Sequence, residues 1–429
     1  MRYQPLPASF YQASRARLTA KLPPRSLAIV HANDQMPTNA DAAFAFKQSS
    51  DLFYLTGVDQ AEAILLLFPD ASNPKMREIL FIKESSELIA IWEGHKLTKE
   101  EAIERSGVQR VEMLDAFDSL WRQAMCEAES VWLNTNEHAR AVVEIHSRDH
   151  RFVHRCHQQY PLHTYRRLAP VLHQLRSVKT KEEVDRIHHA CQITKAGFER
   201  VLRFVKPGVM EYEIEAEFVH EFVKRGSAGF AYSPIIGSGK NNCVLHYVEN
   251  DQECKDGELL LLDVAAEYGN YNSDMTRTIP VNGKFSPRQR AVYDAVLRTV
   301  RRCNEMLQPG VLLREYQEQV QKLIEGELLG LGLLKQEDVD KQDPEKPLFK
   351  KYFMHGTSHF LGLDVHDVGL ANDPIQEGMV FTIEPGIYIA EEGFGIRLEN
   401  NVLIKQGGNI DLMGDIPIEA DEIEALMEN

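Results

Sequence analysis

The sequence lacks the features that mark a nucleic-acid-binding protein, a membrane protein or a nucleotide-binding domain. Its 429 residues carry 48 lysines and arginines against 64 aspartates and glutamates, a formal net charge of −16. Without a basic excess, the chain has little with which to replace the counterions of nucleic acid or to bind an anionic membrane surface. No run of about 18 apolar residues and no apolar stretch of a secretory signal occurs, so we expect neither a membrane span nor a targeting segment. No G-x-G-x-x-G or P-loop pattern opens a helix in the first half, which argues against a nucleotide site there.

The cysteine spacing excludes the common redox and zinc motifs. None of the six cysteines forms a C-x-x-C pair; they stand at positions 126, 156, 191, 243, 254 and 303. In a chain of this length we expect reduced, mostly buried thiols, as in a cytoplasmic protein.

One local group of basic residues runs against the acidic balance, near the expected boundary between two domains. It comprises Arg166, Arg167, Arg176, Lys179 and Lys181. Charge runs of this kind usually form a solvated face. We therefore interpret the group as a linker surface rather than a binding site.

The length suggests more than one domain, at about 150 residues per domain. In residues 1–176, strand-like runs alternate with helical patterns, which predicts an α/β layered domain and is compatible with a doubly wound sheet. The strand-like runs cover 26–31, 61–68, 78–82 and 130–133, and the helical patterns cover 10–22, 99–105 and 115–128. This domain shows no evident chemistry of its own.

The second predicted domain, residues 177–429, repeats one plan. A capping box at 180–183 opens a helix to about 204, followed by a helix over 211–225, and a second pair begins at about 286 and ends at about 324. The sequence FVKPGV after the first helix recurs as MLQPGV after the third. An ancient duplication would give two helix pairs backing one curved antiparallel sheet, an α+β fold. Since Pro-Gly ends many helices, the repeat alone leaves both interpretations open.

Four carboxylates stand at the ends of strand-like segments in this domain. Asp263 ends an apolar run and Asp274 opens an alternating one, so the two segments form a hairpin candidate with both acids in one layer. Glu384 ends another apolar run. A period of two places Arg397 and Glu399 on one face of a further strand.

A glycine-punctuated segment, HGTSHFLGLDVHDVG at 355–369, holds three histidines. It has too short an apolar run to bury much surface, so we interpret it as the wall of a reaction centre that serves these acids. His355 and His359 could share a helix face at i, i+4, but the H-E-x-x-H zinc pattern is absent.

The acids pose a charge problem that bound cations would solve. Buried carboxylates without partners cost several kcal/mol or become protonated, and only Arg277 and Arg397 lie nearby in sequence. Two divalent ions balance four carboxylates, and a neutral imidazole adds a ligand without charge. Oxygen-rich ligation favours Mn²⁺ and leaves Co²⁺, Fe²⁺ and Zn²⁺ open. For any single acid, a strand-end salt bridge is the simpler interpretation.

At these residues the chain resembles the pita-bread metallopeptidases, most closely the Xaa-Pro aminopeptidases, over nearly its whole length. The segments that carry the resemblance are QSSDLFYLTG at 48–57, IWEGH at 91–95, LHYVEN at 245–250, LDVA at 262–265, SDMTR at 273–277, the histidine segment, TIEPG at 382–386 and GIRLE at 395–399. The resemblance implies a smaller N-terminal domain, a pita-bread catalytic domain and a peptidase that uses two metal ions.

The resemblance also assigns roles to residues of this chain. It implies five metal ligands: Asp263, Asp274, His359, Glu384 and Glu399, of which Asp274 and Glu399 would bridge both ions. It implies catalytic or substrate-binding roles for His246, His355, His366 and Arg397, with Glu384 moving a proton. Trp92 matches an aromatic residue that reaches a neighbouring subunit's site in tetrameric members, so a homodimer or homotetramer is expected. The connection from Glu384 to Glu399 is shorter than in bacterial members, which affects the rim of the pocket.

These expectations define a reaction and its rivals. A water shared by two ions would attack the carbonyl before a proline in position two, and the proline needs an apolar wall, for which His355, Tyr388 and Trp92 are candidates. A prolidase shares the fold and ligands but accepts only dipeptides. Methionine aminopeptidase needs no first domain of this size, and creatinase-like enzymes and non-catalytic pita-bread binding proteins lack the acids.

Overall fold

The computed structural model describes residues 2–84, 86–142 and 144–428. Contacts between its residues divide it into two compact units. One unit spans Pro5–Arg176, and the other runs from Ser177 onward and includes the chain up to Gln4. The first residues therefore pack with the second unit: the Arg2 side chain donates to the Ser227 carbonyl at 3.2 Å, and the ring of Tyr3 meets that of Tyr268 edge-on. The helices that the structure describes include none that is long and apolar enough to cross a bilayer.

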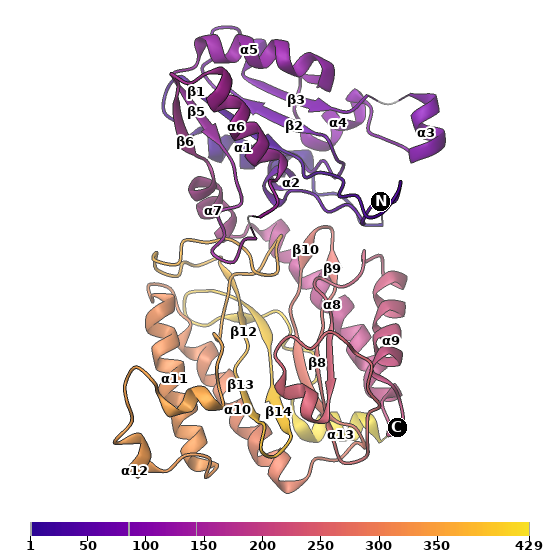
Figure 1. Cartoon of the computed structure of the whole chain (residues 1–429), viewed down its shortest axis with the longest axis vertical. Helices are drawn as coiled ribbons and strands as arrows, with labels where there is room; N and C mark the ends of the chain where they lie inside the picture. Colours follow the sequence, from indigo (N-terminus) through magenta and orange to yellow (C-terminus); the bar gives the residue numbers. More distant parts are fainter. Residues whose placement is uncertain (1, 85, 143, 429) are drawn as a thin grey trace. The chain divides into compact units, whose positions relative to one another are not determined.

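The N-terminal unit is built on a six-stranded mixed sheet in the order β4-β3-β2-β1-β5-β6, with helices beside it (Figure 1). The pairs β1–β2 and β2–β3 are antiparallel, and the pairs β3–β4, β1–β5 and β5–β6 are parallel. Its strands are β1 Ser26–His31, β2 Ile64–Leu67, β3 Glu78–Ile82, β4 Val111–Met113, β5 Ser130–Leu133 and β6 Thr164–Arg167. Its α-helices are α1 Ala8–Thr19, α2 Ser50–Thr56, α3 Glu87–Glu93, α4 Lys99–Ser106, α5 Phe117–Glu127, α6 Arg148–Gln159 and α7 Ala169–Ser177.

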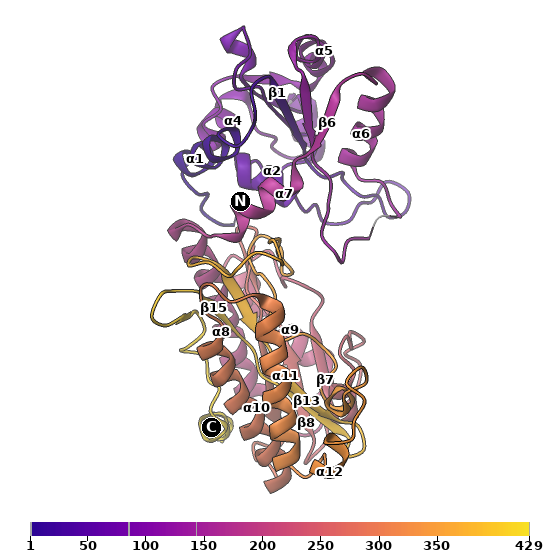
Figure 2. The same ribbon diagram turned by 90° about the vertical axis from the view of Figure 1, so that its left-hand side faces the viewer.

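Two helix pairs of the second unit follow the predicted plan. Thr180 caps α8 (Lys181–Phe204), and Ser286 caps α10 (Pro287–Met306), each through a capping box. The second helices are α9 Glu211–Lys224 and α11 Leu313–Gly330, the latter longer than predicted. Figures 1 and 2 show α8 beside α9 and α10 beside α11, with the strands between the two pairs. Shorter helices are α12 Gln336–Val339 and α13 Ala420–Met427, with the 3₁₀ turns η3 Gly239–Cys243 and η4 Leu348–Lys351.

The strands of this unit pair antiparallel in several short ladders. The ladders are β7-β8-β11, β12-β15-β16, β13-β14 and β9-β10. Their strands are β7 Ile235–Ser238, β8 Leu259–Asp263, β9 Glu267–Tyr268, β10 Tyr271–Asn272, β11 Thr276–Pro280, β12 Val380–Ile383, β13 Gly386–Ile389, β14 Phe394–Arg397, β15 Asn400–Leu403 and β16 Ile410–Asp411. The strands that follow the first helix pair meet those that follow the second where the Glu399 N–H donates to the Thr276 carbonyl at 3.0 Å. As a result, Asp263, Asp274, Glu384 and Glu399 come close together.

Two local expectations are wrong. The segment 355–369 contains no helix, so His355 and His359 do not share a helix face. The basic group near the domain boundary is also not a uniform solvated surface. Arg166, Arg167 and Lys181 are exposed, but Arg176 is buried against Asp51, and Lys179 forms a buried ion pair with Asp367 at 2.8 Å.

Candidate metal centre

The first two acids are positioned by the β8–β11 hairpin. Asp263 is the last residue of β8 and pairs across the ladder with Thr276, the first residue of β11. Asp274 lies just before β11, after the small β9–β10 hairpin. The amide of Asn401 holds its backbone on both sides: the Asp274 N–H donates to Oδ1 at 3.0 Å, and Nδ2 donates to the Asp274 carbonyl at 2.7 Å. Asn401 is therefore a positioning residue that the sequence patterns did not predict.

The histidine segment and the end of β12 supply the next two groups. The His359 N–H donates to Thr382 Oγ1 at 3.2 Å, and the Glu384 N–H donates to the Thr357 carbonyl at 2.8 Å. His359 Nδ1 lies 2.9 Å from the carbonyl of Phe360, which places the proton on Nδ1. Nε2 then faces the acids, 3.4 Å from Asp274 Oδ2 and 3.6 Å from Glu384 Oε1. An imidazole oriented through its other nitrogen is the usual arrangement of a metal ligand.

Glu399 is the last acid of the cluster, and its carboxylate has few hydrogen-bond donors around it. Its Oε2 accepts from Thr276 Oγ1 at 2.8 Å, whereas Oε1 is buried and has no hydrogen-bond partner. Ligand atoms of Asp274, His359 and Glu399 all lie within 4.8 Å of one another. A buried carboxylate oxygen without a donor, beside an imidazole lone pair and another carboxylate, fits a bound cation.

Protein cations do not neutralise this cluster. Arg277 is fully buried, but its guanidinium donates to neutral acceptors, among them the Glu399 carbonyl at 2.6 Å. Arg397 pairs with Asp263 at 2.5 Å. Within the described part of the chain, no lysine or arginine forms an ion pair with the other three acids. The charge problem foreseen from the sequence therefore persists in the folded protein.

The pKa values reflect this shortage of positive charge. Burial raises the pKa of Glu384 to about 7. Burial also raises the pKa of Glu399 well above its usual range, and Asp274 and Glu384 act in the same direction. For Asp263, burial raises the pKa despite the opposing charge of Arg397. Burial tends to lower the pKa of His359, but Asp274 and Glu384 outweigh it and the pKa is raised. Without metal, the cluster would hold protons at positions that cations could occupy.

A chain of hydrogen bonds leads from Asp263 to the histidine segment. Arg397 Nη2 donates to Asp263, and Nη1 donates to the Tyr388 hydroxyl at 2.8 Å. That hydroxyl lies 2.8 Å from His355 Nε2, while Nδ1 lies 2.7 Å from the Gly356 carbonyl. The proton on Nδ1 leaves Nε2 to accept from Tyr388. Burial, aided by Arg397, lowers the pKa of His355 to about 4, so this imidazole is neutral.

Thr276 joins the arginine to the cluster. Its hydroxyl accepts from Arg397 Nε at 3.0 Å and donates to Glu399. Arg397 is the last residue of β14 and Glu399 lies between β14 and β15, so the two do not share one strand as predicted, although both side chains contact this hydroxyl. Tyr388 is 2% exposed, so its ring lies behind His355 rather than on an open wall.

The remaining predicted residues are His366, His246 and Trp92, and their surroundings differ. The ring of His366, an exposed residue, stands edge-on to that of His359 with centroids 4.4 Å apart. His246 is exposed in the loop after η3. Trp92 belongs to the N-terminal unit, where it is 81% exposed on α3 and is not a core residue.

Two contacts at the centre have weak or no sequence signals. The Tyr232 hydroxyl donates to Asp263 Oδ1 at 2.6 Å from a loop distant in sequence, so no local pattern indicates it. Thr276 lies two residues after Asp274 in the SDMTR segment, so the sequence alone indicates that it is near one proposed ligand. Its contact with Glu399 could not be predicted, because the two residues are far apart in the chain.

Comparisons with known proteins agree with this geometry. Residues 185–406 match the model of metallopeptidase family M24, and residues 11–132 match the aminopeptidase P N-terminal domain. The chain is 35% identical to the Xaa-Pro aminopeptidase of Escherichia coli K12, with 97% of each chain covered, and 33% identical to that of Haemophilus influenzae, with 98% of each covered. A structure of zinc-substituted E. coli aminopeptidase P in complex with product superposes with a TM-score of 0.88 at 33% identity, covering 99% of each chain. The resemblance inferred from the motifs is confirmed: the chain belongs to metallopeptidase family M24 and carries the aminopeptidase P N-terminal domain.

Proposed function

We propose that this protein is a metallo-aminopeptidase that releases the N-terminal residue from peptides with proline in position two. The observation that carries the proposal is the group of buried Asp274, half-buried His359 and buried Glu399, whose ligand atoms converge and in which one carboxylate oxygen has no hydrogen-bond partner. Full-length similarity to two Xaa-Pro aminopeptidases supports the substrate class.

The proposed metal ligands are the five residues Asp263, Asp274, His359, Glu384 and Glu399. Four carboxylates and one imidazole would hold two divalent ions, most favourably Mn²⁺, because the set is rich in oxygen and contains no thiolate. When bound, such ions polarise a carbonyl oxygen and lower the pKa of a water to near neutrality. Two observations support this assignment: Glu399 Oε1 has no hydrogen-bond donor, and the pKa of Glu384 is raised in the absence of metal.

Residues of the chain would transfer the proton, orient the metal ligands and bind the substrate. Glu384 would accept a proton from water and return it to the leaving proline nitrogen, because its carboxylate lies at the cluster, 3.6 Å from His359 Nε2. Arg397 orients Asp263 and, through Thr276, Glu399. His366 and His246 would donate to the substrate carbonyl groups.

Tyr388 and His355 take a modified role in this proposal. Both imidazole nitrogens of His355 already have partners, and the Tyr388 ring is buried. Tyr388 would therefore position His355, and the face of the His355 ring would contact the proline. The rigid, neutral imidazole offers the shape and apolar surface that a proline without an N–H requires.

The exposed helix α3 supports a proposal of self-association. Leu88, Ile91 and Trp92 are 66%, 77% and 81% exposed on this short helix. Apolar side chains gathered in this way often mark a contact surface. We propose that they pack against another copy in a dimer or tetramer, and that the free thiols reflect a cytoplasmic location.

The proposal is tested by an assay on Ala-Pro, Ala-Pro-Ala and Ala-Ala-Ala with protein stripped of metal and then supplied with Mn²⁺. We expect release of alanine from the proline peptides only, and only after metal is added. Hydrolysis of Ala-Pro alone would indicate a prolidase instead. Full turnover by the stripped protein would contradict the metal assignment.

A further inference from the structure

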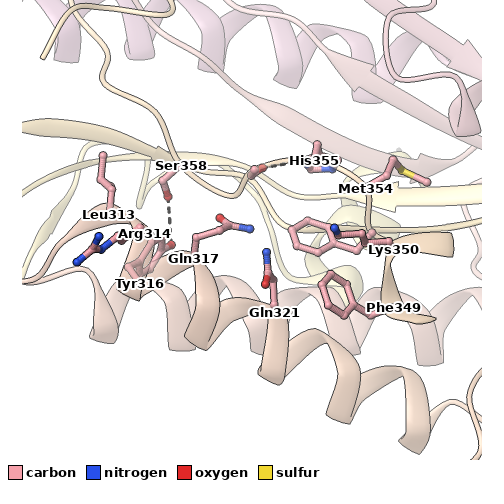
Figure 3. A pocket seen from close by; sticks show the side chains of 12 residues that line it. Leu313, Arg314, Tyr316, Gln317, Gln321, Phe349, Lys350, Met354, His355 and Ser358 are labelled. Atoms are coloured by element: carbon pink, nitrogen blue, oxygen red, sulfur yellow. Dashed lines mark hydrogen bonds between the residues drawn. The ribbon is translucent and has the colours of Figure 1, made fainter. Parts of the chain in front are cut away.

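A concave feature lies beside His355, between α11 and the stretch of chain that runs from η4 to Ser358. The cavity has a volume of about 420 Å³, within the roughly 300–1,000 Å³ of small-molecule sites. We call it the α11 cavity and define it by six of its lining residues: Arg314, Gln317, Gln321, Phe349, Lys350 and His355. Figure 3 shows Gln317 and Gln321 rising from α11 toward the segment that carries Ser358 and His355.

The polar lining of the cavity can bind an anion and a peptide backbone. Arg314 and Lys350 are exposed, and neither has an ion-pair partner among the residues that the structure describes. The Thr357 N–H donates to Gln317 Oε1 at 2.9 Å, which fixes that side chain and leaves its amide nitrogen as a donor.

The dimensions of the cavity match a short extended peptide. Arg314, Gln317 and Gln321 are spaced i, i+3 and i+7, so they lie along one face of α11. Seven residues of helix rise about 10 Å, which equals the span of about three extended residues. Figure 3 shows Arg314 and Lys350 at opposite ends of the row formed by the two glutamines.

The cavity is connected to the metal centre through one side chain. His355 lines the cavity and also ends the hydrogen-bond chain that begins at Asp263 and passes through Arg397 and Tyr388. A peptide whose proline lies against His355 would place its next residues at the mouth of the cavity. The free carboxylate of a short peptide would then meet the unpaired cations.

We propose that the α11 cavity binds the part of the substrate beyond the proline and recognises its C-terminal carboxylate through one of its two cations, Lys350 or Arg314, depending on the length of the peptide. The substrate class is then the short peptide of three to five residues with a free carboxyl end, in preference to the Xaa-Pro dipeptide. This inference rests on the proposed function, because it needs a substrate held at the metal centre.

One test needs no variant. Ala-Pro-Ala-Ala is compared with the same peptide carrying a C-terminal amide, using Mn²⁺-loaded protein at low and high salt. We expect KM to be several-fold lower for the free acid, with kcat alike, and the difference to shrink at high salt because exposed charges are screened. Equal KM values for acid and amide at low salt would overturn the inference.

A matched pair of variants tests the residues. Arg314→Gln combined with Lys350→Gln removes two charges that line the cavity. Lys322→Gln combined with Lys346→Gln removes two exposed charges from the same segments outside it. For the free acid we expect KM to rise about 3- to 5-fold in the first variant only, since one exposed charge pair contributes up to about fivefold. Hydrolysis of the amide and of Ala-Pro should be unchanged.

The outcomes separate this inference from the proposed function. If the wild-type protein hydrolyses Xaa-Pro peptides but both double variants behave alike, the carboxylate site is wrong and the peptidase assignment stands. If no Xaa-Pro peptide is hydrolysed, the proposed function fails first.

Discussion

Two buried glutamates of the same unit, Glu211 and Glu399, differ in how their carboxylates are satisfied. Glu211, which is fully buried, accepts four hydrogen bonds: from the Ser238 N–H and hydroxyl at 2.7 Å each, from the Tyr247 hydroxyl at 2.8 Å and from the Gln252 N–H at 3.0 Å. Glu399 is 2% exposed, and its side chain accepts one hydrogen bond, on Oε2.

The difference shows how a structural carboxylate can be told from a candidate ligand. Donors surround Glu211 because it fastens both ends of the loop that carries His246. Around Glu399 other acids gather instead, and one oxygen is left unpartnered. A buried polar atom without a partner costs roughly 1–3 kcal/mol. Such an arrangement is expected where a bound cation completes the site.

Removing a proposed ligand should have the largest effect. Asp274→Asn or Glu399→Gln should lower kcat/KM at least about 100-fold, because substitutions of residues that only support metal ligands already cost 10- to 100-fold. Elemental analysis should show less than two ions per chain. Glu211→Gln is the matched control and should retain its metal. Normal metal content in both ligand variants would break the comparison.

The two glutamates should respond in opposite directions when metal is absent. Glu211→Ala leaves four hydrogen-bond donors without an acceptor and should lower the free energy of unfolding by about 2–4 kcal/mol. Glu399→Gln replaces a carboxyl group whose ionisation is opposed by burial and by neighbouring acids, so it should leave the unfolding free energy of the stripped protein unchanged or raise it. Urea unfolding of both variants in chelator measures this. Equal destabilisation would show that Glu399 is also structural.

The pH dependence of stability should differ between stripped and loaded protein. Burial raises the pKa of Glu384 to about 7, above its value in an unfolded chain. The proton therefore stabilises the stripped fold below the unfolded pKa, and this contribution, on the order of 3 kcal/mol, is lost as pH rises through about 7. The raised pKa of His359 acts in the same direction. With Mn²⁺ bound the ionised acids are neutralised, so the decline should disappear. Thermal unfolding from pH 5 to 8 with and without Mn²⁺ tests this.

A smaller effect is expected from the link between the centre and the α11 cavity. Tyr388→Phe leaves Arg397 Nη1 and His355 Nε2 without their shared partner. We expect kcat/KM to fall about 5- to 30-fold, in line with roughly 1 kcal/mol for each of the two hydrogen bonds lost, while metal content stays normal. A loss of metal would mean that Tyr388 supports the ligands directly.

Local patterns were sufficient for much of the fold. Capping boxes at Thr180 and Ser286 opened helices where predicted, and the apolar run before Asp263 formed a strand paired with the segment after Asp274. These features depend on residues within a few positions of one another. Where partners are remote, local patterns were insufficient: Asn401 holds Asp274, and Lys179 pairs with Asp367.

The amino-acid sequence by itself determined which residue types are available: the acids at strand ends, the histidine segment, the excess of negative charge and the resemblance to a metallopeptidase family. Only the tertiary structure decided which of those groups have partners. It directed Arg277 to neutral acceptors, placed the hydroxyl of Thr276 between Arg397 and Glu399, and left one carboxylate oxygen unpartnered. The reason is physical: charge is carried by single residues, whereas its neutralisation depends on distances between residues far apart in the chain.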